Sequence, residues 1–299
     1  MKIAISGSHG FLGSALIKLL EAHDYEILRL VRSNPGENEI AYDIDKQTID
    51  AQKLDDANID IFIHLAGEGI ANKKWTEEQK QKILTSRTLG TQLIAKTLAN
   101  LENKPKLFIS ASAIGFYGDR GEETLDETSV KGEDFVSGVC EQWEQATEEA
   151  TKAGIRTAII RTGIVLNKNG GTLKRMLLPF KLGMGGRLGD GKQFMSWITL
   201  NDWVRAVRYI CDRNLEGTFN LVAPCAVTNA QFTQALGKRL HRPTLIPTPL
   251  FPLNKIYGEE LVQTLLLGSQ NVVPKALIKA GFNFETDTIK TALKTILGN

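Results

Sequence analysis

Three glycines near the start of the chain have the spacing of a phosphate-binding turn. Gly7, Gly10 and Gly13 lie in ISGSHGFLGSAL, between a short apolar run and residues with helical periodicity. Glycine adopts positive φ angles readily and has no Cβ atom, so the backbone of such a turn can approach a ligand closely. The free N–H groups at a helix start, with the helix dipole behind them, attract an anion. The segment therefore predicts binding of a dinucleotide pyrophosphate, and the alternative is a tight turn without a ligand.

The end of the second predicted strand indicates which dinucleotide is bound. An enzyme that prefers NAD places Asp or Glu there, about 20 residues after the glycines, to bind the ribose 2′-hydroxyl. This chain has Arg32 and Ser33 instead, with no acidic residue beside them. Because a planar guanidinium makes paired bonds to phosphate oxygens, Arg32 favours NADP(H), unless it is a solvated loop charge. Asp43 is a candidate for the adenine amino group, and the alternative for it is a turn cap.

The elements that must position these residues alternate between strand and helix. Short apolar runs predict strands, and apolar residues three and four apart predict helices. The predicted strands are Lys2–Ser6, Glu26–Val31, Asp60–Leu65, Lys106–Ala111 and Ile155–Arg161. The predicted helices include Asp134–Lys152, which Gly154 ends, and two that open at the capping-box patterns Thr76–Gln79 and Thr228–Gln231. This alternation predicts an α/β fold with a Rossmann-type, doubly wound parallel sheet.

The alternation stops in a glycine-rich, basic stretch, NKNGGTLKRMLLPFKLGMGGRLGDGK. A later run, Gly217–Pro224, is typical of a strand that returns to the sheet. We therefore assign residues 1–166, with 195–224 returning, to an NADP-binding Rossmann domain. Residues 167–194 and 225–299 then form a smaller C-terminal substrate-binding region on the strand ends, where ligands bind in open α/β sheets.

Composition limits the classes of function. The chain has 299 residues, 42% of them hydrophobic and 23% charged, which is enough for a large core or two domains. A net charge of +2 gives no reason to expect a nucleic-acid or membrane partner, and no apolar stretch approaches the length of a membrane span. The scattered cysteines Cys140, Cys211 and Cys225 fit reduced thiols and no metal site. We expect a cytoplasmic protein with a small-molecule substrate, and a homodimer is an open alternative to a monomer.

Several segments, taken in order, resemble a known group of enzymes. They are SGSHGFLG, HLAGEGI, ISASAIGFYGDRG, VCEQWE, IIRTGIVL, MSWITLNDWVRA and PKALIKAGF. Together they are similar to the extended and atypical branch of the short-chain dehydrogenase/reductase superfamily. Within it, the chain resembles epimerase family proteins described as nucleoside-diphosphate-sugar-epimerase-like or cell-division-inhibitor-like. The resemblance covers essentially the whole chain and implies an NADP-binding Rossmann domain followed by a C-terminal substrate domain.

The resemblance also implies a set of cofactor contacts along the strand ends. The glycine turn then holds the pyrophosphate, and the end of the second strand takes the adenosine phosphate. The implied residues are Ser8, Phe11 and Leu12 beside the pyrophosphate, Arg32 and Ser33 at the adenosine phosphate, Leu65, Ala66 and Gly67 under the adenine-side ribose, Glu68 as a further contact, and Ser110 and Ala111 beneath the nicotinamide.

The catalytic pair of the superfamily is missing from this chain. Its members use a Tyr that exchanges a proton with the substrate and a Lys four residues later, because a phenol is a poor base at neutral pH without a cation beside it. In GEDFVSGVCEQWEQA the Tyr position falls near Phe135 or Val136, and the Lys position near Val139 or Cys140. The standard hydride-transfer mechanism is therefore in doubt. Cys140 is either a nucleophile or a small core residue.

The remaining catalytic candidates lie in SASAIGFYG. Ser112 matches the strand-end Ser that orients the substrate, and Tyr117 resembles the Tyr that follows it in extended members. The interval between them is one residue longer than usual, so Phe116 is an alternative occupant of that place. Tyr117 is then either the proton donor or a packed aromatic residue beside Gly118.

Residues further along the chain are candidates for substrate binding. Arg161 ends a strand and can hold a phosphate or carboxylate, or else form a structural salt bridge. Gln193, Ser196 and Trp197 lie in a segment resembling the element that closes the substrate pocket, and Asp202 is expected to be a helix N-cap rather than an acid. Basic residues in this region suggest an anionic ligand, or else a solvated loop: Lys174, Arg175, Lys181, Arg187 and Lys192.

Two functions follow from these residues. The first is an NADP-dependent reductase or epimerase that acts on a small anionic or sugar-like metabolite, with Ser112 and Tyr117 as catalytic residues. The second is a non-catalytic NADP(H)-binding sensor or regulatory protein, for which the missing Tyr-x-x-x-Lys pair is the argument. The pocket-closing segment favours the enzyme, since a sensor does not need one.

Overall fold

An eight-stranded sheet forms the centre of the computed structural model, which describes residues 1–298. Its strands, in spatial order, are β12 (Gly217–Leu221), β8 (Arg156–Thr162), β6 (Leu107–Ala113), β5 (Ile61–His64), β1 (Lys2–Ser6), β2 (Glu26–Val31), β3 (Glu39–Asp43) and β4 (Thr48–Ile49). All neighbours pair in parallel except β3 and β4, which are antiparallel. This is the Rossmann-type sheet that the alternating pattern predicts, and β12 returns to it beside β8.

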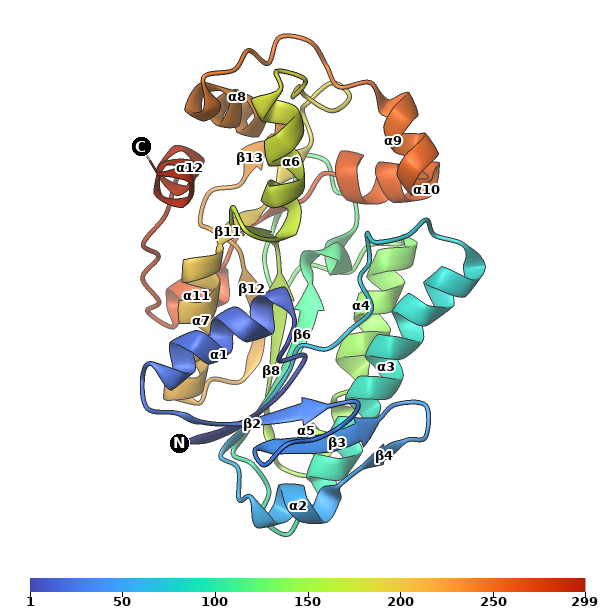
Figure 1. Cartoon of the computed structure of the whole chain (residues 1–299), viewed down its shortest axis with the longest axis vertical. Coiled ribbons are helices and arrows are strands. Elements are labelled where there is room, and N and C mark those ends of the chain that lie inside the picture. The colour runs from blue at the N-terminus through green and yellow to red at the C-terminus, as the bar shows by residue number, and fades with distance from the viewer. Residues whose placement is uncertain (299) are drawn as a thin grey trace.

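Successive residues of a strand point to opposite faces of the sheet, and in these strands both sets are apolar. Helices therefore cover both faces of the sheet. Ile3 and Ile5 pack against one set of helices, whereas Ala4 between them packs against the other. The first set is α1 (Phe11–Glu21), α7 (Leu200–Arg213) and α11 (Lys275–Lys279). The second set is α2 (Ala51–Asp56), α3 (Glu77–Asn100) and α5 (Glu148–Lys152). α4 (Phe135–Gln145) lies beside α3 on this face (Figure 1). The doubly wound architecture is therefore confirmed.

A second group of elements gathers at the other end of the molecule (Figure 1). Its helices are α6 (Gly171–Lys181), α8 (Asn229–Leu240), α9 (Leu250–Tyr257), α10 (Glu259–Leu261) and α12 (Ile289–Leu297). Its short strand pairs are β10 (Phe194–Met195) with β13 (Val227–Thr228), β9 (Ile164–Leu166) with β11 (Trp197–Thr199), and β7 (Thr124–Leu125) with β14 (Asn271–Val272). Leu173, Phe180 and Phe232 contribute to a separate apolar cluster here. None of the helices in residues 1–298 has the length and apolar character needed to span a membrane.

Two predicted helix features differ from the structure. The helix predicted over Asp134–Lys152 is divided into α4 and α5, and the Thr147 hydroxyl bonds the Glu144 carbonyl at 2.7 Å at the break. The capping pattern at Thr76 is only half used, because the Thr76 backbone N–H bonds the Lys74 carbonyl and the Gln79 side chain donates to Glu68. At Thr228 the two reciprocal bonds with Gln231 both form, so that capping box is confirmed.

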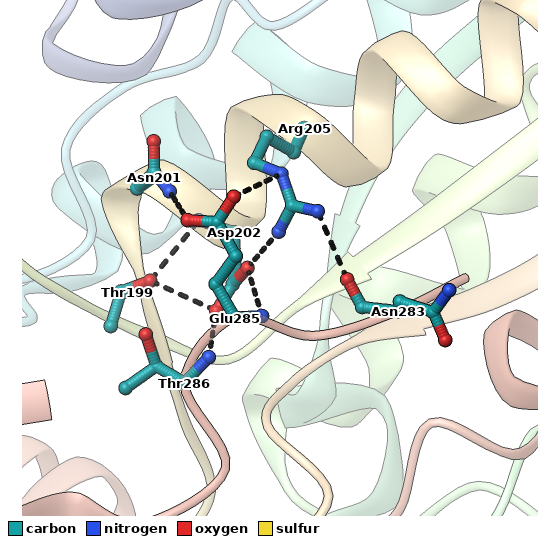
Figure 2. Close-up of polar contacts among 7 residues, drawn as sticks. All are labelled: Thr199, Asn201, Asp202, Arg205, Asn283, Glu285 and Thr286. Carbon is teal, nitrogen blue, oxygen red and sulfur yellow. Dashed lines mark hydrogen bonds and ion pairs between the residues drawn. The ribbon is translucent and has the colours of Figure 1, made fainter. Parts of the chain in front are cut away.

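Asp202 is not the N-cap of α7 that its position suggests. Thr199 is the N-cap, and its hydroxyl accepts a bond from the Asp202 backbone at 3.1 Å. The buried Asp202 carboxylate instead accepts bonds from the backbone N–H groups of Glu285 and Thr286, each at 3.0 Å, and pairs with Arg205 (Figure 2). Asp202 therefore ties α7 to the segment that leads into α12.

Candidate functional site

The glycine turn lies where the strand order of the sheet reverses direction. β1 has β2 on one side and β5 on the other, so the connection after β1 leads to one side of β1 and the connection from β4 to β5 leads to the other. Ligands of open α/β sheets bind at such a point, outside the carboxyl ends of the strands. Gly7 leaves β1 with a φ of +74°, and a Cβ atom there would lie 2.8 Å from the Ala66 nitrogen. The residues after β1 and β5 are therefore in direct contact at the switch point.

Each glycine of the turn is explained by a different contact. Gly7 has the positive φ angle, and Gly13 lies so close to β1 that a Cβ atom would be 2.2 Å from the Gly7 carbonyl oxygen. Gly10 is exposed, has an ordinary φ of −72°, and its nearest neighbour is the same oxygen at 3.1 Å from an added Cβ. The fold itself therefore requires Gly10 least, and its bare surface leaves room for a group outside the protein.

The start of α1 has the features of an anion site. Gly10 is the N-cap residue, and no side chain caps the helix or places a carboxylate in its first turn. Ser8 is buried and its hydroxyl bonds the His9 ring at 3.2 Å, which leaves the first-turn amides of Phe11 and Leu12 without a side-chain acceptor. Free amides at the positive end of a helix bind phosphate groups. This geometry fits a dinucleotide pyrophosphate.

The predicted adenosine end of the site is exposed. Arg32 and Ser33 directly follow β2, and Arg32 forms no ion pair among residues 1–298. Asp43 accepts bonds from the backbone N–H groups of Asp45 and Lys46, both at 3.0 Å. Asp43 is thus the turn cap that the sequence offered as its alternative, and its contact with adenine stays a prediction.

The segment after β5 lies beside the glycine turn. Leu65 and Ala66 contact Gly7, and Gly67 is exposed at the same edge. The Glu68 nitrogen donates to the Ser86 hydroxyl at 3.1 Å, so this loop is attached to α3. Ser110 is buried in β6 next to β5, and Ala111 follows it partly exposed.

A buried polar network joins the ends of β6, β8 and β12. Ser112, Arg161 and Asn220 are direct neighbours across these strands. The Arg161 guanidinium forms two bonds with the Glu144 carboxylate, each 2.8 Å, and Ser112 donates to the same carboxylate at 2.6 Å. Arg161 also donates to the Tyr117 hydroxyl at 3.0 Å, and this hydroxyl donates to Asn220 at 2.7 Å.

This network decides between the alternatives for Arg161 and weakens the case for Tyr117. Arg161 is buried in a structural salt bridge and lies over the Phe116 ring, 3.4 Å from its centroid. Tyr117 has no exposed surface, and burial raises the pKa of its hydroxyl, which is already engaged as donor and acceptor. The geometry favours the packed aromatic residue, and proton donation by Tyr117 is a prediction that it does not support.

Cys140 is a core residue rather than a nucleophile. The thiol is buried in α4, and burial raises its pKa to about 12, with the Glu144 carboxylate adding to the rise. Because the thiolate is the nucleophilic form, a buried thiol with a raised pKa is poorly suited to attack a substrate.

The residues predicted to line the substrate pocket are buried within the protein. The Gln193 amide donates to the carbonyls of Leu188 and Leu266, at 3.2 and 3.1 Å. The Ser196 hydroxyl donates to the Gln270 carbonyl at 2.7 Å. Trp197 lies in the apolar cluster that contains Leu173 and Phe232. Their role in substrate binding stays a prediction, because in this structure they hold loops and helices together.

Comparison with known proteins decides the family. The sequence pattern of the NAD dependent epimerase/dehydratase family matches residues 3–222. The chain belongs to this family. Residues 248–296 of this epimerase-family chain also match a domain of unknown function (DUF1731). The epimerase match agrees with the resemblance that the sequence indicates.

Relatives of this epimerase-family chain match it along nearly its whole length. Epimerase family protein Mb2239 of Mycobacterium bovis is 39% identical over 293 residues, which is 97% of this chain and 96% of that protein. The crystal structure of human epimerase family protein SDR39U1 with NADPH has a TM-score of 0.89, 31% identity and 99% coverage of both chains. A nucleoside-diphosphate sugar epimerase from Corynebacterium glutamicum has a TM-score of 0.80 and 36% identity, over 100% of this chain and 58% of that one.

Three polar residues of the epimerase-family chain were not predicted as site residues. Glu144 lies within the segment VCEQWE, and Asn220 lies within the predicted returning strand. No motif in the sequence relates either residue to the residue that it bonds. His64 is the third: it ends β5, pairs in register with Ser6, and bonds the Ser6 hydroxyl beneath the glycine turn. An apolar strand that ends in a histidine was the available signal for it.

We expect His64 to make this protein sensitive to acid. Burial, with a smaller contribution from Arg87, lowers the pKa of His64 to about 3. The unfolded chain protonates this residue near its ordinary pKa of about 6.5, so stability is complete above that pH and is lost as the pH falls toward 3. The slope between these values is about 1.4 kcal/mol per pH unit from this residue. Urea unfolding at a series of pH values from 7 to 4 measures this slope of the free energy of unfolding.

The matched variants are His64→Asn and the exposed His23→Asn. The first should flatten the pH profile of the free energy of unfolding, and the second should leave it as in the wild type. An unchanged slope in His64→Asn would show that other groups cause the acid sensitivity.

Proposed function

We propose that this chain binds NADP(H) and uses it to oxidise or reduce a small metabolite that is anionic or a nucleotide sugar. The observation that carries the proposal is the glycine turn at the switch point, with an uncapped helix start and an exposed Gly10. A human relative with the same fold over 99% of its chain has been crystallised with NADPH, which supports this cofactor.

The end of β2 supports NADP(H) over NAD(H). Arg32 is exposed, forms no ion pair among the residues described, and has no acidic neighbour in sequence. A free guanidinium at this place suits a 2′-phosphate, with which it can make paired, charge-assisted bonds. An acid that would bind the ribose 2′-hydroxyl of NAD is missing from this strand end.

The chemistry would divide between cofactor and protein. The nicotinamide supplies a hydride acceptor or donor when it is bound. The first-turn amides of α1 and Arg32 would hold the two phosphate-bearing parts. Ser112 already donates its hydroxyl proton to Glu144, so its oxygen is suited to accept a bond from a substrate hydroxyl and orient it. Four exposed cations support an anionic substrate: Lys174, Lys181, Arg187 and Lys192.

Calorimetric titration tests the choice of cofactor. NADPH should bind at least about tenfold more tightly than NADH, and Arg32→Asp should weaken NADPH binding by about 1.5–3 kcal/mol while leaving NADH binding unchanged. Arg213→Asp, the same charge change on α7, is the control and should bind NADPH as the wild type does. Equal affinity for the two dinucleotides in the wild type contradicts the proposal.

A non-catalytic NADP(H) sensor is the second candidate. It is favoured by the absent Tyr-x-x-x-Lys pair and by the buried, fully engaged Tyr117 hydroxyl. Consumption of NADPH against a panel of small carbonyl compounds and nucleotide sugars separates the two functions. We expect turnover that Ser112→Ala lowers, and tight NADPH binding without turnover on any compound would favour the sensor.

A further inference from the structure

The missing lysine leaves the site without a cation on α4. The position that it would take falls near Val139 or Cys140, and both side chains are uncharged and buried. Cys140 lies beside Ser112 and Ala113 at the end of β6, so this position faces the strand end that the sequence places beneath the nicotinamide. A cation near this point must therefore come from another element of the fold.

Arg87 of α3 lies close to this position. Its guanidinium is close to Cys140, and stacks on the Trp143 ring of α4 with its Cζ atom 5.0 Å from the centroid. It also contacts the exposed loop after β5, because a Cβ atom on Gly67 would lie 3.4 Å from that Cζ atom. Arg87 thus lies between the vacant lysine position and the loop beside the glycine turn.

Arg87 has few partners for a half-buried charge. It forms one hydrogen bond, from Nη1 to the Ile83 carbonyl at 3.0 Å, although a guanidinium carries five N–H donors. Among residues 1–298 no carboxylate pairs with it, and the Glu68 carboxylate in the same region is bonded to Gln79. Burial lowers the pKa of Arg87 without neutralising it, since an arginine stays protonated in proteins. Its Nε and Nη2 donors keep some contact with solvent, so a ligand can reach them.

We propose that Arg87 supplies from α3 the cation that the missing lysine would supply from α4, and binds the nicotinamide half of NADP(H) through its ribose hydroxyls. This assignment rests on the proposed function. It adds a cofactor contact from α3, a helix to which the sequence motifs assign none. It also explains why α3 presents an arginine to the loop at Gly67 instead of an apolar residue.

A fragment of the cofactor separates this role from general damage. Adenosine 2′,5′-bisphosphate has the adenine half and the 2′-phosphate but no nicotinamide ribose. We expect Arg87→Met to raise the Kd for NADPH at least tenfold and to change the Kd for the fragment less than twofold, measured by calorimetry. Arg87→Lys should restore part of the NADPH affinity, because it keeps the charge. Arg213→Met, which removes one charge from α7, should bind both ligands like the wild type.

The outcomes are distinguishable. If the wild type binds neither NADPH nor the fragment, the proposed function is wrong. If the wild type binds NADPH and Arg87→Met binds it equally well, the assignment of Arg87 is wrong. If Arg87→Met raises the Kd of NADPH and of the fragment equally, the assignment is also wrong. The lost contact would then involve the adenine half that the two ligands share.

Discussion

Replacing Glu144 by alanine is expected to lower the free energy of unfolding by about 3–5 kcal/mol. Glu144 and Arg161 expose 14% and 6% of their side chains, and they share two bonds of 2.8 Å. Removal of one partner of a buried ion pair leaves the other charge without compensation in a poorly solvated place. Ser112 also loses its acceptor, so the variant disturbs the end of β6 as well as that of β8.

Urea unfolding of Glu144→Ala beside Glu141→Ala provides the comparison. Glu141 is on the same helix, and its ion pair with Lys131 is exposed, at 37% and 39% of the side chains. Exposed pairs contribute about 0–1 kcal/mol, so the control should be nearly as stable as the wild type. Equal, small losses in the two variants would contradict a structural role for the Glu144–Arg161 pair.

Replacing Gly10 by valine is expected to weaken NADPH binding at least a hundred-fold, or by about 2.8 kcal/mol, while the protein stays folded. The φ of Gly10 is −72°, which any L-residue adopts, but an added Cβ would lie 3.1 Å from the Gly7 carbonyl oxygen, so the turn must shift by a few tenths of an ångström to accept it. A branched side chain would instead fill the space in front of the α1 amides. The main expected loss is therefore of ligand binding, with only a small adjustment of the turn.

Thermal unfolding with and without NADPH measures this effect. The wild type should gain stability from NADPH and Gly10→Val should not, at similar melting temperatures without ligand. Gly138→Val in α4 is the matched control, because an added Cβ there meets no atom within 4 Å. A stabilisation by NADPH in Gly10→Val as large as in the wild type would show that the turn does not hold the cofactor.

Local sequence alone determined the fold class and the glycine turn of this protein. Strands β1 and β2 have the predicted bounds, because short apolar runs between turn residues have few other ways to bury both faces. Gly7 and Gly13 are required by contacts within one strand-turn-helix unit, which the spacing of a few residues encodes. Periodicity and glycine spacing are local signals, so they can be read without the rest of the chain.

Only the tertiary structure decided what the polar side chains at the strand ends do. Arg161 had two alternatives until the fold brought Glu144 to it from α4, and Tyr117 is engaged because Asn220 arrives from a strand 103 residues away. Arg87 reaches the vacant lysine position from another helix, and Asp202 finds its partners 83 and 84 residues further on. Such pairs depend on which strands and helices pack together, and no local pattern specifies that packing because the partners are remote in sequence.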